Sequence, residues 1–163
     1  MSEPHRYLIA LGGNVRHHRY GPPESVLVAA TEAIDDGMGK VVARSTVIRS
    51  APVGPSARRY ANSAILVESK LEPREMLAGL KRLEADFGRR SGGRRWSART
   101  LDCDIVLWSG GTWGDDDLVI PHPLFRERGF VLRPAADIAA QWRDPLSGRT
   151  IQQLLFRNRH QGA

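Results

Sequence analysis

Two aspartates separated by a single residue, Asp102 and Asp104, stand in an apolar stretch directly after an arginine-rich one. Successive side chains of a strand alternate between its two faces, so an extended chain places both carboxylates on one face, roughly 6.5 Å apart along the strand. The apolar side chains expected on the other face are Leu101, Cys103, Ile105 and Leu107. Like charges on one strand face repel each other, so a compensating cation is expected beside them. The pattern predicts a strand with one packed face and one charged face.

The chemistry that suits this pair of carboxylates is the binding of a divalent cation. Mg²⁺ prefers a few carboxylate oxygens and completes its coordination with water and substrate phosphates. Arginine side chains, which bind phosphate through paired hydrogen bonds, are frequent nearby. They are Arg89, Arg90, Arg94, Arg95, Arg99 and, further on, Arg128. We therefore predict a site for a metal-bound polyphosphate, and the alternative is a solvated strand edge paired with its neighbouring arginines.

The stretch from residue 88 to residue 100 holds five arginines and no acidic residue, interleaved with Ser91, Gly92 and Gly93. A loop that folds over a phosphorylated ligand needs this composition, because glycine permits motion and guanidinium groups bind phosphate. A loop that only aids solubility is the alternative.

Length, charge and cysteine content narrow the class of protein. A chain of 163 residues is most simply one domain, residues 1–163, with a core that needs no disulfide. The lone Cys103 falls on the predicted buried face, which suits a reducing compartment. No signal peptide or membrane-length apolar stretch is seen, so a soluble cytoplasmic protein is expected. The net charge of +6 suits nucleic acid, an anionic membrane or a small polyanionic substrate, and its concentration in one stretch favours the last.

Hydrophobic periodicity predicts the elements that position these residues. Strands are expected over residues 7–11, 41–49, 60–67 and 101–107, with helices over 23–37 and 73–87. This order predicts a ferredoxin-like α+β sandwich with a βαββαβ core, a mainly antiparallel sheet and helices packed on it. Additions at the C-terminus are an apolar stretch over 131–140 and a short helix over 150–156. The connection over 15–21, with His17 and His18, is interpreted as exposed.

Two further features could bind a ligand. Tyr60 and Asn62 share a strand face, and an aromatic platform beside an amide suits a flat heterocycle. A surface pair beside a loop fits equally well. His122 lies between two prolines, which suits an oriented phosphate or metal contact and also suits a plain turn.

The combined pattern resembles hydroxymethyl-dihydropterin pyrophosphokinase, a family of folate biosynthesis. The residues that carry the resemblance are Leu11-Gly12-Gly13-Asn14, Val53-Gly54-Pro55, Tyr60-x-Asn62, Arg95-Trp96-x-x-Arg99-Thr100-Leu101-Asp102-x-Asp104-Ile105, Pro121-His122-Pro123 and Arg128-Gly129-Phe130. They span most of the chain, and their combination is highly specific.

The resemblance implies a ferredoxin-like fold and transfer of the β,γ-pyrophosphoryl group of ATP to the pterin alcohol, with release of AMP. Asp102 and Asp104 would hold two Mg²⁺ ions. The catalytic residues would be these two aspartates together with Arg89 and Arg99. The ATP site would be formed by Glu84, Arg89, Arg95, Trp96, Arg99, Ile105, His122 and Arg128. The pterin site would be formed by Ser50, Val53, Gly54, Tyr60, Asn62 and Phe130. The partners would be these two small molecules, with no nucleic acid and no membrane, and the protein would be a monomer.

The chain departs mildly from the family pattern. Ser97-Ala98 stands where the family commonly has Gly-Pro, and Cys103 where it commonly has leucine or valine. A non-catalytic ferredoxin-like nucleic-acid-binding module is an alternative, but it requires an exposed aromatic RNP pattern that the sequence lacks. A Mg²⁺-dependent nuclease is another alternative, and an inactive homologue is a third.

Overall fold

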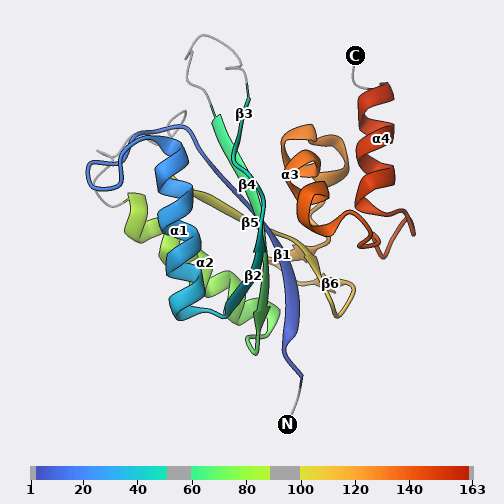
Figure 1. Cartoon of the computed structure of the whole chain (residues 1–163). Coiled ribbons are helices and arrows are strands. Elements are labelled where there is room, and N and C mark those ends of the chain that lie inside the picture. The colour runs from blue at the N-terminus through green and yellow to red at the C-terminus, as the bar shows by residue number, and fades with distance from the viewer. Residues whose placement is uncertain (1–2, 51–59, 89–99, 162–163) are drawn as a thin grey trace.

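A computed structural model of the chain describes residues 3–50, 60–88 and 100–161 (Figure 1). Within these residues one antiparallel sheet is formed by β1 (His5–Gly13), β2 (Lys40–Arg44), β3 (Ile48–Ser50), β4 (Tyr60–Ser69) and β5 (Asp102–Trp108). The order across the sheet is β2-β4-β1-β5, and β3 also pairs with β4. Both β2 and β3 pair with β4, and together they take the place of one edge strand. The order across the sheet is therefore that of a ferredoxin-like fold. The predicted fold class is confirmed.

The strand predicted over residues 41–49 is interrupted, and Ser45 explains the interruption. Its backbone N–H donates to the carbonyl of Ala64 at 2.9 Å, and its hydroxyl accepts the N–H of Ala64 at 2.9 Å. A side-chain oxygen therefore replaces a backbone carbonyl in the ladder, which ends regular pairing at that point. A shift of register between Val41 and Ala43 adds to the irregularity of this edge.

Two helices cover one face of the sheet. They are α1 (Pro23–Gly37), which begins with proline in its first turn, and α2 (Pro73–Gly88). Their apolar side chains repeat at helical spacing, as Met76, Leu80 and Phe87 do along α2, and these meet the inward side chains of β1 and β4. This face holds the larger of the two buried clusters.

The other face carries the C-terminal helices, α3 (Gly129–Ala139) and α4 (Ile151–Gln161). Figure 1 shows them on the side of the sheet opposite α1 and α2. Helix α4 continues to Gln161, beyond the predicted end at residue 156, and it starts with a reciprocal cap. The N–H of Thr150 donates to the side chain of Gln153 at 2.9 Å, and the N–H of Gln153 donates to the hydroxyl of Thr150 at 3.1 Å.

The side-chain alternation predicted for β5 holds as far as Ile105 and is wrong for Leu107. Cys103 and Ile105 pack under α1 and α2, whereas Leu107 packs with Val106 under α3 and α4. On β1 the consecutive residues Leu8 and Ile9 lie opposite Leu107 and Ile105, so β5 contains one extra residue. This β-bulge reverses the faces of the residues that follow it.

Short elements join β5 to α3. A small hairpin of β6 (Trp113–Gly114) and β7 (Val119–Ile120), which periodicity did not predict, is followed by the 3₁₀ turn η1 (Phe125–Glu127). The acidic run at 115–117 forms the turn of this hairpin. Asp115 accepts the N–H of Asp117 at 2.8 Å and the N–H of Leu118 at 3.0 Å.

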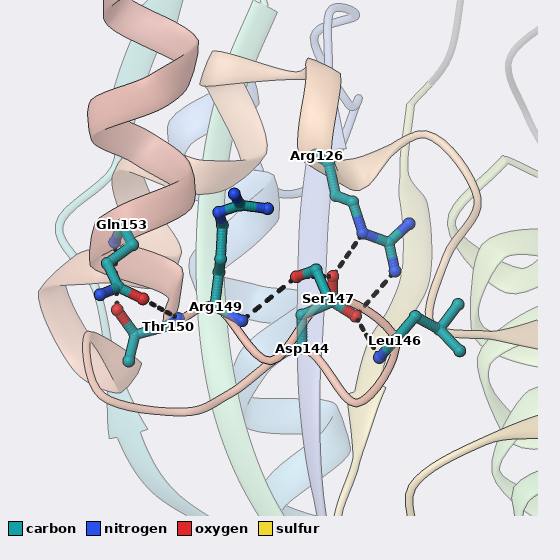
Figure 2. A network of polar contacts seen from close by, with 7 residues as sticks. All are labelled: Arg126, Asp144, Leu146, Ser147, Arg149, Thr150 and Gln153. Carbon is teal, nitrogen blue, oxygen red and sulfur yellow. Dashed lines mark hydrogen bonds and ion pairs between the residues drawn. The ribbon is translucent and has the colours of Figure 1, made fainter.

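A buried ion pair fixes η1 to the connection between α3 and α4 (Figure 2). The carboxylate of Asp144 is fully buried and accepts two hydrogen bonds from Arg126, at 2.5 and 2.7 Å. Ser147 and the N–H of Leu146 donate to the same carboxylate at 2.7 and 3.0 Å. Burial raises the pKa of Asp144, but these hydrogen bonds and the charge of Arg126 outweigh burial and lower it to about 2.

The connection from β1 to α1 differs from the exposed loop that was expected. His18 is exposed, but the side chain of His17 is among the buried polar groups, at 8 % exposure.

The described helices include none with the length and apolar character that a bilayer crossing needs.

Candidate active site

A cavity of about 480 Å³ lies where β1, β4 and β5 meet the start of α3. It is lined by Ala10, Leu11, Gly12, Tyr60, Asn62, Asp102, Asp104, Arg128, Phe130 and Val131. Six of these residues belong to the predicted site: Tyr60, Asn62, Asp102, Asp104, Arg128 and Phe130. Residues from distant parts of the chain are thus brought into one cavity, and their roles stay predictions.

Strand pairing explains the floor of the cavity. Gly12 lies directly opposite Asn62 on β4 and Asp102 on β5, and in the next row Ala10 lies opposite Asp104. Directly paired residues project to the same face of a sheet, so the amide and the carboxylate flank Gly12. A Cβ built on Gly12 would lie 3.0 Å from Oδ1 of Asn62. The strand predicted over residues 7–11 ended before Gly12, and its role in the cavity was not predicted, because the sequence of a strand does not specify which residues pair with it.

The wall of the cavity comes from the start of α3. Phe130 keeps 39 % of its surface exposed, a large share for an aromatic side chain at a helix start. The guanidinium carbon of Arg128 lies 5.6 Å from the centre of the Phe130 ring, within cation–π range. Tyr60, at the start of β4, supplies a second aromatic ring to the same cavity. The cavity therefore combines flat apolar surfaces with a cation.

His122 stands beside the carboxylates, just outside the cavity lining. Its Nε2 is 3.8 Å from Oδ2 of Asp104, and its Nδ1 accepts the N–H of Leu124 at 3.1 Å. Burial lowers the pKa of His122, Asp104 raises it and Arg128 lowers it, with a net lowering. A neutral ring whose Nδ1 is an acceptor carries its proton on Nε2, the atom that faces Asp104.

Glu84 and Ile105 do not line the cavity. The carboxylate of Glu84, on α2, accepts the N–H of Cys103 at 2.7 Å and lies 3.5 Å from the Lys81 ammonium. It thereby satisfies a backbone donor of the edge strand β5 at the residue between the two aspartates. Burial is the main cause of a raised pKa at Glu84. The side chain of Ile105 packs in the cluster under α1 and α2 and therefore points away from the cavity.

Of the other predicted site residues, only Ser50 is in the described part of the chain. Ser50 is the last residue of β3 and pairs with Tyr60 in the ladder. Six predicted site residues lie outside the described part of the chain: Val53, Gly54, Arg89, Arg95, Trp96 and Arg99.

The donor set fits a metal that is shared with a substrate. Among the described residues no group of three or more histidine, cysteine, aspartate or glutamate side chains could hold a metal ion. Asp102 and Asp104 offer oxygen donors from one strand face, and the side chain of Asp104 is 46 % exposed. Mg²⁺ is commonly bound in this way, with one or two carboxylates completed by phosphate oxygens and water.

Fold and cavity together define a ferredoxin-like α+β protein with two carboxylates, a cation and aromatic surfaces in one cavity. Residues 8–140 match the family model of 7,8-dihydro-6-hydroxymethylpterin-pyrophosphokinase (HPPK). The chain belongs to this family, and the resemblance expected from the sequence is confirmed.

The names of similar proteins are consistent with membership of this family. The chain is 37 % identical over 152 residues to the 2-amino-4-hydroxy-6-hydroxymethyldihydropteridine pyrophosphokinase of Synechocystis, covering 93 % of this chain and 75 % of the relative. It is 34 % identical to the protein of the same name from Pseudomonas aeruginosa, covering 92 % of this chain and 90 % of the relative. The mitochondrial folate synthesis bifunctional protein of Arabidopsis thaliana is 34 % identical over 138 residues, and this match covers 24 % of that protein.

Solved structures support the fold. The crystal structure of wild-type Plasmodium falciparum HPPK-DHPS matches 95 % of this chain with a TM-score of 0.74. The sequence identity is 13 %, and the chain spans 41 % of the length of that protein. This likeness is one of fold alone.

Proposed function

We propose that this chain transfers the β,γ-pyrophosphoryl group of ATP to the hydroxymethyl group of 6-hydroxymethyl-dihydropterin in folate biosynthesis, giving the pterin diphosphate and AMP. Membership of the family supports this activity. The observation that carries it is a cavity that joins two carboxylates to aromatic and amide side chains. A pyrophosphokinase needs both parts, one for the triphosphate and one for the pterin.

The pterin is assigned to the end of the cavity nearest Tyr60 and Asn62. Tyr60 and Phe130 stack on its ring, and Asn62, which is 5 % exposed, pairs with its polar edge. A buried amide discriminates between heterocycles, because its donor and acceptor favour a ring edge that offers matching groups. Ser50, Val53 and Gly54 are assigned to the same substrate.

ATP is assigned to the carboxylate end. Asp102 and Asp104 hold Mg²⁺, for which we propose two ions, and Arg128 and His122 contact the nucleotide. The remaining assignments to ATP are Glu84, Arg89, Arg95, Trp96, Arg99 and Ile105. We also propose that the protein acts as a monomer and that residues 1–163 form one domain.

The reaction forms a bond between the hydroxymethyl oxygen and Pβ and breaks the bond between Pβ and the bridging oxygen to Pα, so that AMP leaves. When bound, Mg²⁺ supplies positive charge to the triphosphate. Asp102 and Asp104 fix that charge on one strand face, and the aromatic walls orient the alcohol toward Pβ. The protein thus contributes mainly positioning and charge, as phosphoryl-type transfer requires. The alcohol proton is released as the bond to Pβ forms.

A coupled assay tests this proposal directly. The purified protein is incubated with ATP, Mg²⁺ and 6-hydroxymethyl-dihydropterin, and AMP is separated from ADP by chromatography. AMP that forms only when the pterin is present supports the proposed transfer. Formation of ADP would indicate an ordinary kinase, and the absence of any nucleotide product would contradict the proposed function.

Replacing Tyr60 by alanine is expected to weaken pterin binding by about fivefold or more, since an aromatic contact of this kind contributes about 1 kcal/mol beyond its buried area. ATP binding should change by less than twofold, because the ring lies on the pterin side. Calorimetric titration of each ligand measures both. Tyr20→Ala, which removes a tyrosine away from the cavity lining, is a comparison variant for the pterin. Equal weakening of both ligands by Tyr60→Ala would argue against stacking.

Replacing Gly12 by alanine is expected to raise KM for the pterin by about tenfold, because the new methyl group displaces the amide of Asn62 from its buried position. Gly114→Ala is the matched control, since a Cβ there meets no atom within 4 Å. Steady-state kinetics with saturating ATP measures the effect. Unchanged pterin KM in a folded Gly12→Ala protein would show that the close approach of Gly12 to Asn62 is unimportant.

A further inference from the structure

His17 is unusually well bound for a residue in a connecting loop. Its Nδ1 accepts the backbone N–H of Arg19 at 3.0 Å and of Tyr20 at 3.3 Å. The backbone of His17 also exchanges two hydrogen bonds with Gly21, at 2.8 and 2.9 Å, and Gly21 has a φ of 91° that suits glycine. The ring therefore lies inside a closed turn that the chain makes between β1 and α1.

This turn is packed against the last turn of α2. The ring of His17 lies 5.9 Å from that of Phe87, and the ring of Tyr20 stacks on Phe87 at 5.1 Å with 20° between the planes. His17 and Tyr20 are themselves 4.8 Å apart. Phe87 is 6 % exposed, so the contact is part of the core. Burial lowers the pKa of His17, the charges of His18 and Arg19 lower it further, and a hydrogen bond at the backbone of Phe87 acts in the opposite direction.

The last turn of α2 is in turn attached to the candidate active site. Glu84 lies three residues before Phe87 and accepts the N–H of Cys103, which stands between Asp102 and Asp104 on β5. The end of α2 therefore contacts the turn at His17 through Phe87 and contacts the strand that carries both carboxylates through Glu84. Helix α2 ends at Gly88, the first residue of the arginine-rich stretch in the sequence.

We propose that His17 is a positioning residue for ATP, acting by holding the last turn of α2 against the loop that follows β1. This inference rests on the proposed function for the assignment of ATP to the carboxylate end of the cavity. The pterin end is formed by β4, Gly12 and α3. The ring contacts of His17 described here are with His18, Tyr20 and Phe87, on the side of α2. Loss of the His17 ring therefore affects the two substrates unequally.

The test compares three variants by their KM for ATP, their KM for the pterin and their unfolding temperature. His17→Ala is expected to raise KM for ATP by about tenfold, since small displacements remote from the chemistry have effects of this size or larger. KM for the pterin should stay within about twofold of wild type. His18→Ala removes the exposed neighbouring ring, which lies 4.3 Å from His17, and is expected to behave as wild type.

His17→Asn separates the positioning role from the folding of the loop. Its Oδ1 takes the place of Nδ1 and can accept the same two N–H groups, so the unfolding temperature should be closer to wild type than that of His17→Ala. The ring contacts with Phe87 are still lost, so KM for ATP should stay raised. Wild-type KM for ATP in His17→Asn, or an equal rise for both substrates in His17→Ala, would overturn the proposal.

Two further measurements keep the outcome decisive. If His17→Ala does not fold, Phe87→Leu removes the stacked ring and keeps apolar bulk, and a raised KM for ATP supports the proposal while an unchanged one overturns it. If the wild-type protein forms no AMP, the proposed function fails separately. A non-hydrolysable ATP analogue with Mg²⁺ is then titrated by calorimetry. Weaker binding to His17→Ala than to His18→Ala supports the role of His17, and equal binding contradicts it.

Discussion

Replacing Asp102 or Asp104 by asparagine is expected to lower kcat by about a thousandfold while the protein stays folded. Each substitution removes one negative charge from the face that is to hold Mg²⁺ and the triphosphate, and electrostatic groups of this kind contribute about 10²–10³ each to a rate. The fold should tolerate the change, because the two carboxylates repel each other on one strand face. Single-turnover measurement of AMP at saturating Mg²⁺ gives the rate, and circular dichroism monitors the fold.

The control for these variants is Asp36→Asn, which removes an exposed carboxylate from α1. It changes net charge by the same amount and should leave kcat within about twofold, as surface substitutions usually do. Pterin binding provides a second readout, since Asn62 and Tyr60 are intact in every variant. Wild-type turnover in both aspartate variants would remove the metal assignment, whereas a loss of turnover accompanied by unfolding would point to a structural role.

The Asp-x-Asp pair shows which part of the site a sequence can predict. That Asp102 and Asp104 share a face follows from the period of a strand, which is local. The position of Leu107 could not be predicted in this way, because one extra residue on β5 reverses the alternation, and that residue is defined only by the register against Leu8 and Ile9. Local periodicity predicts which face of the sheet a side chain occupies only as far as the next β-bulge, and a β-bulge is defined by pairing with another strand.

The positions of Gly12 and His17 also depend on residues distant in the sequence, so local patterns could not predict them. Gly12 is in the cavity floor because Asn62 and Asp102 are its partners across the sheet, about 50 and 90 residues away along the chain. His17 lies in a segment without hydrophobic periodicity, and it is buried because Phe87 of α2 packs on it. The signal that could have indicated His17 is the group of aromatic residues at 17–20, which is unusual for a solvated loop.

The largest effect on stability is expected at the ion pair shown in Figure 2. Replacing Arg126 by methionine is expected to lower the free energy of unfolding by about 3 kcal/mol at pH 7, because it leaves the fully buried carboxylate of Asp144 without its charged partner. The pair also fixes η1, which ends directly before Arg128, so substrate binding should weaken at temperatures at which η1 loses its fixed position. Urea denaturation followed by tryptophan fluorescence measures the change in free energy.

The dependence of this effect on pH distinguishes the ion pair from simple loss of packing. In the wild-type protein the pKa of Asp144 is lowered to about 2, so its contribution to stability is complete above the unfolded value of about 4 and is lost as pH falls from there toward 2. In Arg126→Met the lowering effect of Arg126 on the pKa of Asp144 is lost, so the carboxyl group protonates at a higher pH than in the wild-type protein and its charge without a cationic partner disappears. The difference in stability between the two proteins should therefore shrink between pH 7 and pH 3.

Arg149→Met, which removes an exposed arginine from the same connection, is the control and should lower the free energy of unfolding by less than about 0.5 kcal/mol at either pH. A penalty for Arg126→Met that stays constant with pH would show that the arginine stabilises the fold through packing on the Phe125 ring, 4.7 Å away, and not through its charge.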